Sequence, residues 1–219
     1  MILSRYHLIF LHVQKTAGNS VSELLLPYSD DHKTLNKHQD GKDRFGLRGP
    51  ATKRKHALLA DYHETLADDF HRYRVAIAIR DPFARAVSMY FSPHKWLVPQ
   101  QGQWVRQSPY WNIDRFETLV DTMVSLTDFL MINGTVQIPD YTIRQDNLTV
   151  DLEHLLSDVG IQASVAGLPH INKSAANTAL IETAIQDRRA REICDKRFST
   201  DITFINQLYP TLSGQRRSA

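Results

Sequence analysis

Residues 6–20 read YHLIFLHVQKTAGNS, and this stretch sets the expected fold. The apolar run over residues 6–13 predicts a short buried strand, and residues 14–20 form a polar loop. Apolar residues at helical spacing then continue to Pro27, so the loop opens a helix. A loop between a strand and a helix N-terminus is where α/β proteins bind anions, because free backbone N–H groups and the helix dipole both favour negative charge.

The side chains of this first loop, residues 14–20, suit an anion. Lys15 supplies a positive charge, and Thr16, Asn19 and Ser20 offer hydrogen-bond donors. The nucleoside-triphosphate P-loop, GxxxxGK[ST], needs its lysine after the glycines, whereas Lys15 precedes Gly18. The alternative interpretation is an ordinary strand–helix turn with a solvated lysine.

A second motif, RDPFARAVSMY at residues 80–90, follows the apolar strand predicted for residues 74–79. Its Asp-Pro pair is typical of a helix start. The carboxyl ends of parallel strands share one edge of a sheet, so this motif and the first loop are expected to lie together. Arg80 could hold a phosphate with its planar guanidinium, and Ser88 could add a hydroxyl. The alternative is a structural ion pair of Arg80 with Asp81 or another carboxylate.

Strands and helices alternate along the rest of the chain. Helices are predicted over residues 61–70, 114–131, 152–159 and 179–209, a third strand over residues 141–145, and long loops over residues 28–56 and 93–110, the first with room for a short strand. A capping box of Asp114 and Glu117 is expected to open the second of these helices. The alternation predicts an α/β fold with a central, mostly parallel sheet flanked by helices. We expect a single domain over residues 1–212 and a frayed tail over residues 213–219.

The charge and cysteine content argue against several classes of protein. Lys and Arg number 26 against 24 Asp and Glu, and a net charge of +2 does not suit a protein that coats nucleic acid. The single cysteine, Cys194, excludes an internal disulfide framework and a cysteine zinc cluster. No apolar stretch reaches the length of a membrane span, and the N-terminus lacks the pattern of a signal peptide. We expect a cytoplasmic protein with no nucleic-acid partner.

The charge is unevenly distributed. Residues 33–56 carry eight Lys or Arg and two Asp, a local charge of +6, so the remainder carries −4. One interpretation is electrostatic steering of an anionic substrate toward His56 at the end of this stretch. The other is a solvated basic loop.

Taken together, HVQKTAGNS (residues 12–20) and IRDPFARAVSMY (residues 79–90) resemble the paired motifs of sulfotransferases that use 3′-phosphoadenosine 5′-phosphosulfate (PAPS). The first is similar to their 5′-phosphosulfate loop and the second to their 3′-phosphate motif. Carbohydrate-type members, including the uronyl and heparan 2-O-sulfotransferases, share the Arg-Asp-Pro variant. Weaker similarities at residues 143–148 and 168–174 extend the resemblance over most of the chain.

The resemblance implies the P-loop-kinase-like sulfotransferase fold and a role for each motif residue. Lys15 would contact the 5′-phosphosulfate and neutralise charge on the bridging oxygen as the sulfuryl group leaves. The rest of the donor site implied by the resemblance consists of Thr16, Ala17, Gly18, Asn19 and Ser20 around the phosphate, Arg80 and Ser88 on the 3′-phosphate, and Lys173 and Ser174 closing over the nucleotide. One departure is Asn19, where family members usually carry Thr; an amide can still donate.

Sulfuryl transfer to a hydroxyl needs a proton acceptor. The resemblance implies a Glu or His ahead of the second motif, and His56 matches that position best. The fallback bases are His63 and Glu64, and Asp61 and Asp68 are further candidates. Neighbouring Lys and Arg are expected to lower the pKa of His56 and keep it neutral.

The expected enzyme is a PAPS-dependent sulfotransferase without a metal, acting on a hydroxyl of a glycan precursor or small glycoside in a bacterial cytoplasm. Two alternatives stay open: a catalytically silent PAPS- or glycan-binding protein, and a nucleotide-dependent kinase of related fold.

The aromatic residues Trp96, Trp104, Tyr110 and Trp111 either close a loop or form a wall for sugar rings. His12, inside the first strand, is expected to pack in the core or behind the site.

Overall fold

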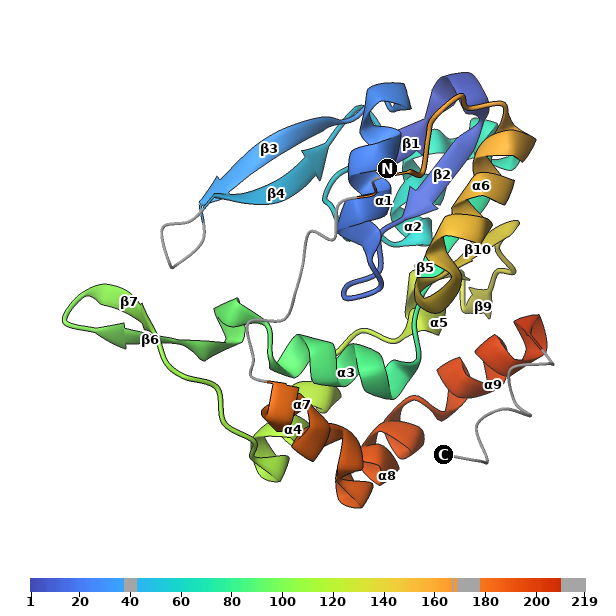
Figure 1. The fold of residues 1–219 in the computed structure, drawn as a ribbon. Helices are drawn as coiled ribbons and strands as arrows, with labels where there is room; N and C mark the ends of the chain where they lie inside the picture. The colour runs from blue at the N-terminus through green and yellow to red at the C-terminus, as the bar shows by residue number, and fades with distance from the viewer. Residues whose placement is uncertain (38–42, 167, 169–177, 210–219) are drawn as a thin grey trace.

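The computed structural model describes the chain except residues 38–42, 167, 169–177 and 210–219, and gives only the backbone of residues 35–37 and 43–45. Its central sheet has the order β1–β2–β5–β10, formed by β1 (Ile2–Leu3), β2 (Leu8–Leu11), β5 (Arg74–Ile79) and β10 (Tyr141–Arg144). β2, β5 and β10 are parallel, and only β1 runs antiparallel. The predicted α/β fold with a mostly parallel sheet is therefore confirmed (Figure 1).

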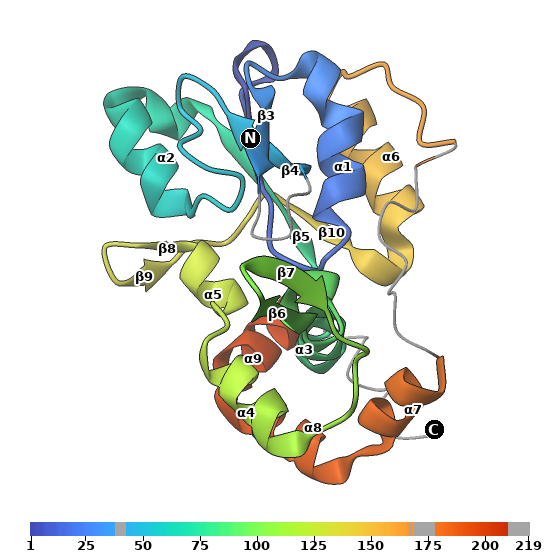
Figure 2. The same cartoon turned by 90° about the vertical axis from the view of Figure 1, so that its left-hand side faces the viewer.

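β1, β2 and β5 bury apolar side chains on both faces, as expected for strands covered by helices. On β2, Leu8 and Phe10 face α1 (Gly18–Leu25) and α6 (Leu148–Val159), whereas Ile9 and Leu11 face α2 (Leu59–Leu66) and α5 (Leu126–Phe129). Figure 2 shows α1 and α6 on one side of the sheet and α2 on the other. The sheet is thus fixed from both sides, and its strand ends are held in place.

A second group of helices lies beyond the carboxyl ends of the strands (Figures 1 and 2). It consists of α3 (Pro82–Tyr90), α4 (Ile113–Asp121), α7 (Thr178–Gln186), α8 (Arg188–Arg197) and α9 (Ser199–Leu208). The core shared by α3, α4, α7 and α8 includes the aromatic side chains Phe83, Tyr90 and Phe116. This group supports α3 and so positions the second motif, residues 80–90. Across the described residues, no helix has the length and apolarity of a membrane span.

Two predicted helices are wrong in extent. The helix expected over residues 114–131 ends at Asp121, and its N-cap is Asn112, which accepts from Arg115 N–H, in place of the predicted capping box. The helix expected over residues 179–209 is three helices, because the Asp187 side chain caps a new start at α8. Smaller shifts affect residues 61–70, where α2 ends at Leu66 and a 3-10 turn follows, and residues 152–159, where α6 already begins at Leu148.

The two predicted loops contain antiparallel hairpins. β3 (His32–Lys37) pairs with β4 (Asp43–Arg48), and β6 (Leu97–Gln100) pairs with β7 (Gln103–Arg106). Positive φ angles at Gln101 and Gly102 make the tight turn of the second hairpin. Both hairpins project from the same side of the molecule (Figures 1 and 2). A third hairpin, β8 (Met131–Ile132) with β9 (Thr135–Val136), turns at Asn133-Gly134 in the same way.

A buried carboxylate joins the second motif to the C-terminal helices. Asp201 on α9 accepts hydrogen bonds from Leu126 N–H and Thr127 N–H at 2.6 and 3.0 Å, capping α5. Its oxygen also lies 4.0 Å from the Arg85 guanidinium, and both side chains are buried. Arg85, from the middle of the second motif, donates to the Val124 carbonyl as well. Arg85 therefore has a structural role in this chain.

We predict that Asp201→Ala lowers the free energy of unfolding by about 3 kcal/mol, because it leaves the buried Arg85 charge and two N–H groups without their acceptor. Urea titration followed by circular dichroism measures this. The matched control is Asp195→Ala on α8, an exposed carboxylate whose loss should change stability by less than about 0.5 kcal/mol. Equal effects of the two variants would show that the Asp201 network contributes little.

Candidate active site

The first loop, residues 14–20, has the backbone shape of an anion-binding loop. Lys15 and Ala17 both adopt positive φ, 68° and 66°, which is unusual for residues with a Cβ. The Thr16 hydroxyl donates to the Val13 carbonyl at 2.9 Å and holds the loop in this conformation. Left-handed residues within such a loop turn successive N–H groups toward one concave side, where they can bind an anion.

The N-terminus of α1 adds to this effect. α1 begins at Gly18, and the Ala17 carbonyl accepts from the N–H groups of Ser20 and Val21. The N–H groups that come before Ser20 at this helix start have no acceptor inside the helix, so they are available to a ligand. Asn19, on the same turn, is half-buried. The structure thus places all the predicted loop residues, Lys15 to Ser20, around one helix start.

The structure brings the first loop and the second motif together. An Arg80 Nη atom donates to the Lys15 carbonyl at 3.4 Å, although the two residues are 65 positions apart. The contact exists because β2 and β5 are parallel neighbours, with Leu11 opposite Ile77. Lys15 and Arg80 therefore form one cationic site at the carboxyl edge of the sheet.

Of the residues that the structure describes, Asp81 is the carboxylate whose charge acts on this cationic site. Within the described part of the chain, neither Lys15 nor Arg80 has an ion pair, and the buried Arg80 Nε has no hydrogen-bond partner. Burial, and then the charge of Arg80, lowers the pKa of Lys15. Burial likewise lowers the pKa of Arg80, against the opposing charge of Asp81. Two partly buried cations side by side suit an anionic ligand that would restore their favourable environment.

The charge of Asp81 favours the protonated form of Arg80, and the Asp81 side chain also has a local structural role. Its side chain accepts from Ala84 N–H at 2.9 Å and caps α3, as the Asp-Pro pair predicted. Ser88 lies seven residues beyond this cap, two turns along α3 and on the same face. Ser88 is half-buried. Its pairing with Arg80 on one ligand stays a prediction from the second motif.

His56 contacts the main chain just after β2. Its Nδ1 is 2.8 Å from the carbonyl oxygen of His12, one residue past the end of that strand. A carbonyl only accepts, so Nδ1 carries a hydrogen and the lone pair of a neutral imidazole is on Nε2. Burial lowers the pKa of His56 to about 4, with smaller contributions from Lys55 and Arg54, while the hydrogen bond to His12 opposes the shift. The direction agrees with our expectation, but burial is the main cause and the neighbouring charges are minor.

The fallback bases lie elsewhere. Glu64 is highly exposed and forms an ion pair with Lys53 at 2.8 Å. The His63 ring packs edge-on against Phe70 at 5.0 Å. Asp61 accepts from Leu58 N–H at the start of α2, and Asp68 is exposed. Of the five candidates, His56 is the one that the described contacts join to His12, the residue whose ring packs against Gly18 of the first loop.

Two residues near the loop were not assigned a function from the sequence. His12 is buried, and its ring lies 4.8 Å from that of His56. Lys55 is partly buried, which lowers its pKa to about 8. From the sequence, Lys55 was counted in the basic stretch and was not distinguished from the other cations there. Its position next to His56 was the signal that could have indicated a place near the site.

The basic stretch over residues 33–56 is partly neutralised. Lys33 pairs with Glu23, Lys53 with Glu64 and Arg54 with Asp61. All three acids lie outside the stretch, so less of its charge is available to attract an anion than the count suggests.

Lys173 and Ser174, predicted to close over the nucleotide, lie outside the described residues.

The aromatic residues divide into two groups. Trp96 is buried with its Nε1 donating to the Tyr90 carbonyl, and Trp111 packs on Tyr90 at 5.0 Å. These two belong to the helical core. Trp104 on β7 and Tyr110 are exposed, 38% and 52% respectively, and remain available for contact with a substrate.

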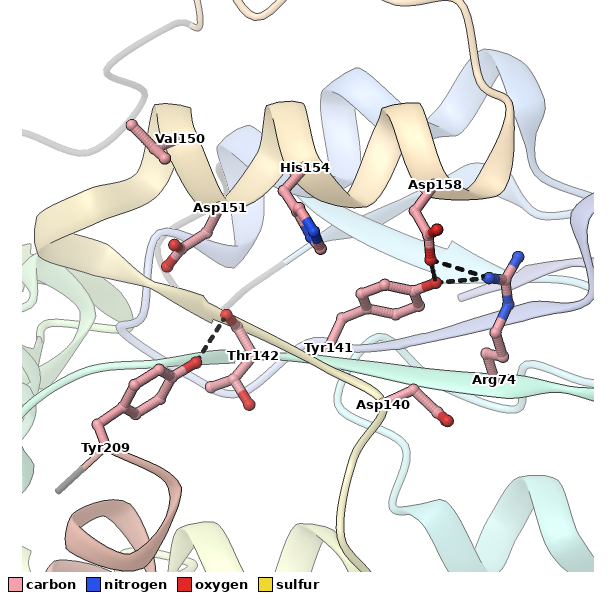
Figure 3. A pocket seen from close by; sticks show the side chains of 9 residues that line it. All are labelled: Arg74, Asp140, Tyr141, Thr142, Val150, Asp151, His154, Asp158 and Tyr209. Atoms are coloured by element: carbon pink, nitrogen blue, oxygen red, sulfur yellow. Dashed lines mark hydrogen bonds and ion pairs between the residues drawn. The ribbon is translucent and has the colours of Figure 1, made fainter.

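A cavity of about 670 Å³ lies apart from this site, along β10 and α6 (Figure 3). It begins at Arg74 and Tyr141, the first residues of their strands, at the opposite end of β5 from Arg80. Asp158 accepts from both residues and so is already engaged, and His154 points toward the same space. None of the predicted site residues lines this cavity.

In the described residues, no cluster of three or more His, Cys, Asp or Glu could hold a metal ion.

Comparison with known proteins identifies a family for the segment that contains this site. The sulfotransferase family model matches residues 1–108, which include the first loop, His56 and the whole second motif. No curated protein and no solved structure matches the chain. The family match and the meeting of Lys15 with Arg80 agree with the resemblance drawn from the two motifs. On this basis residues 1–108, which contain the candidate site, are similar to the sulfotransferase family.

Proposed function

We propose that this protein transfers a sulfuryl group from PAPS to a hydroxyl of a carbohydrate acceptor, with His56 as the base. The observation that carries the proposal is the cationic site formed by Lys15 and Arg80 from two distant motifs. PAPS bears anionic groups at its 5′ and 3′ positions, and two separated phosphate-binding elements on one sheet edge suit such a molecule.

The first loop would hold the 5′-phosphosulfate, through the N–H groups at the start of α1 and the Lys15 ammonium. Arg80 and Ser88 would hold the 3′-phosphate. Lys15 would neutralise the negative charge that develops on the bridging oxygen as its bond to sulfur breaks. Preorganised positive charge in a partly buried site stabilises such a transition state without a further carboxylate or metal ligand.

His56 would accept the proton of the acceptor hydroxyl at Nε2 while the acceptor oxygen forms its bond to sulfur. The hydrogen bond from Nδ1–H to the His12 carbonyl fixes this tautomer and the orientation of the ring. A base with a pKa of about 4 is weak, but a bound anionic donor would raise the pKa of His56 by stabilising its protonated form. Donor binding would therefore prepare the base.

The acceptor is proposed to be a glycan precursor or small glycoside in the cytoplasm. Exposed Trp104 and Tyr110 are the candidates for stacking on sugar rings, since aromatic faces suit the apolar side of a pyranose. An anionic acceptor would find Lys55 beside His56.

We predict that PAP, the product of donor turnover, raises the melting temperature of the protein and that ATP and ADP do so much less. Lys15→Ala and Arg80→Ala should each reduce the PAP effect, because each removes one phosphate contact. Lys15→Ala should also lower radiolabelled sulfuryl transfer from PAPS to a panel of glycans and alcohols by at least about 100-fold, the scale of one electrostatic group at a transition state. Arg74→Ala, in the distant cavity, is the control for loss of a cation and should keep the PAP response.

Stabilisation by ATP but not by PAP would replace this proposal with a kinase of related fold. PAP binding without transfer to any acceptor in the panel would favour a silent binding protein. Near-normal turnover by Lys15→Ala would rule out its assigned role.

We also predict that the pKa of His56 rises when PAP binds. In the free protein the imidazole should stay neutral from pH 8 down to pH 5, because its folded-state pKa is about 4. With saturating PAP, the midpoint should move up into this range, since negative charge favours the imidazolium. The His56 Cε1–H signal in NMR spectra, assigned with His56→Asn, measures both states.

The corresponding activity test compares three variants. His56→Ala should lower kcat by at least about 100-fold, the usual contribution of a positioned base, while His63→Ala and Glu64→Ala should stay near wild type. If His56→Ala keeps wild-type activity and Glu64→Ala abolishes it, Glu64 is the base. A His56 signal that does not respond to PAP would show that the donor does not bind beside it.

A further inference from the structure

We propose that His12 is a positioning residue that couples the first loop to His56, with its main chain orienting the base and its side chain supporting the start of α1. The inference rests on the proposed function for what His56 does, but its geometry stands on four contacts of one residue. His12 lies between β2 and the loop and is 4% exposed, so it cannot itself reach a substrate.

The His12 ring packs directly against the residue that begins α1. A Cβ added to Gly18 would lie 2.4 Å from His12 Cδ2 and 2.6 Å from its Nε2, closer than real Cβ contacts. The φ angle of Gly18 is not in the left-handed region, so the backbone conformation does not require a glycine there. The position of the His12 imidazole does require one. The N–H groups at this helix start, which would face the donor, take their position from the His12 side chain.

A second contact fixes the ring along α1. His12 Nδ1 lies 3.0 Å from the hydroxyl of Ser22, and both groups are buried. Ser22 is four residues after Gly18, one helical turn further along the same face. The ring thus contacts two successive turns of α1, by packing at the first and by a hydrogen bond at the second.

The same residue holds His56 in two ways. The His12 carbonyl accepts from His56 Nδ1–H at 2.8 Å, and the two rings meet edge-on at 4.8 Å with an angle of 87° between their planes. The carbonyl selects the tautomer, and the ring limits rotation of the His56 imidazole and keeps water from it. A change at the His12 side chain should therefore alter the environment of His56 even though the main-chain acceptor remains.

Electrostatics agree with a neutral, supporting imidazole. Burial lowers the pKa of His12 well below its usual value, and the charges of His56, Lys55 and the amino terminus lower it further. Phe10 and Gly18, the other neighbours on the packed elements, carry no charge. His12 does not gain a proton in the neutral range, so the pH response of the pair belongs to His56.

The test follows the His56 Cε1–H signal by NMR between pH 8 and pH 5 in the free protein, where no transfer activity is needed. In the wild type His56 should not titrate in this range. His12→Ala opens the packed space to water, so the pKa of His56 should rise toward its ordinary value of about 6.5 and a midpoint should appear. His12→Phe fills the space and should leave His56 neutral. His154→Asn, an exposed histidine on α6, is the control and should match the wild type.

Activity gives a second readout. For His12→Ala, the ratio of kcat at pH 7.5 to kcat at pH 5 should exceed the wild-type ratio by at least about threefold, as expected for a base whose pKa has risen by one to two units. His12→Phe should lower kcat by about threefold to tenfold through loss of the Ser22 hydrogen bond, with little change in the pH profile. If His12→Ala does not fold, Gly18→Ala replaces it, because its methyl group displaces the ring from the other side.

Titration of His56 that is identical in the wild type, His12→Ala and Gly18→Ala would overturn the proposal. So would a loss of activity of at least about 100-fold in both His12→Phe and His12→Ala while His56→Ala remained active, since His12 would then be the base. If the His56 signal shifts as expected but no variant, nor the wild type, transfers sulfuryl groups, the positioning role stands and the proposed function fails.

Discussion

The parallel pairing of β2 with β5 is the constraint on which the candidate site depends. Because Leu8 lies opposite Arg74 and Leu11 opposite Ile77, both strands end at the same edge of the sheet. Each is followed by a polar turn and a helix start, so the first loop and the second motif meet there. Helices on both faces of the sheet prevent the two strands from sliding. Lys15 and Arg80, 65 residues apart, come into contact as a result.

The two arginines of the second motif show how burial and partners separate binding from structure. Arg85 is buried against Asp201 and the Val124 carbonyl, and its charge is compensated within the protein. Arg80 is partly buried beside another cation, and its Nε, like that of Arg85, has no hydrogen-bond partner in the described chain. Sequence spacing alone makes both residues look like anion ligands. The two arginines differ in their neighbours: α9 brings a carboxylate to Arg85, and the sheet edge brings Lys15 to Arg80.

Local signals predicted the parts of the fold that depend on neighbouring residues. β5 was predicted with its observed bounds, and the Asp81 cap set the start of α3, because both follow from a few consecutive side chains. The hairpins over residues 32–48 and 97–106 were missed, since cross-strand partners and not apolar alternation define them. The break at Asp187 was missed because apolar spacing continues across it. The contact of His56 with the His12 carbonyl joins residues 44 positions apart through a main-chain atom, and no side-chain pattern could have indicated it.

Burial destabilises the positive charges of this site while no anion is bound. The same burial would strengthen their attraction to an anion once one is bound. Removing Lys15, Lys55 and His56 from water lowers the pKa of each, so the free protein holds its protons less tightly there than an exposed surface would. An anionic donor reverses this, because attraction is stronger where water is excluded. Under the proposed function the donor would both gain affinity from these cations and raise the basicity of His56 for the next step. His12 lies at the centre of this arrangement, with its ring against Gly18 of the loop and its carbonyl on the base. Binding of the donor and activation of the acceptor would therefore depend on one buried side chain and its main chain.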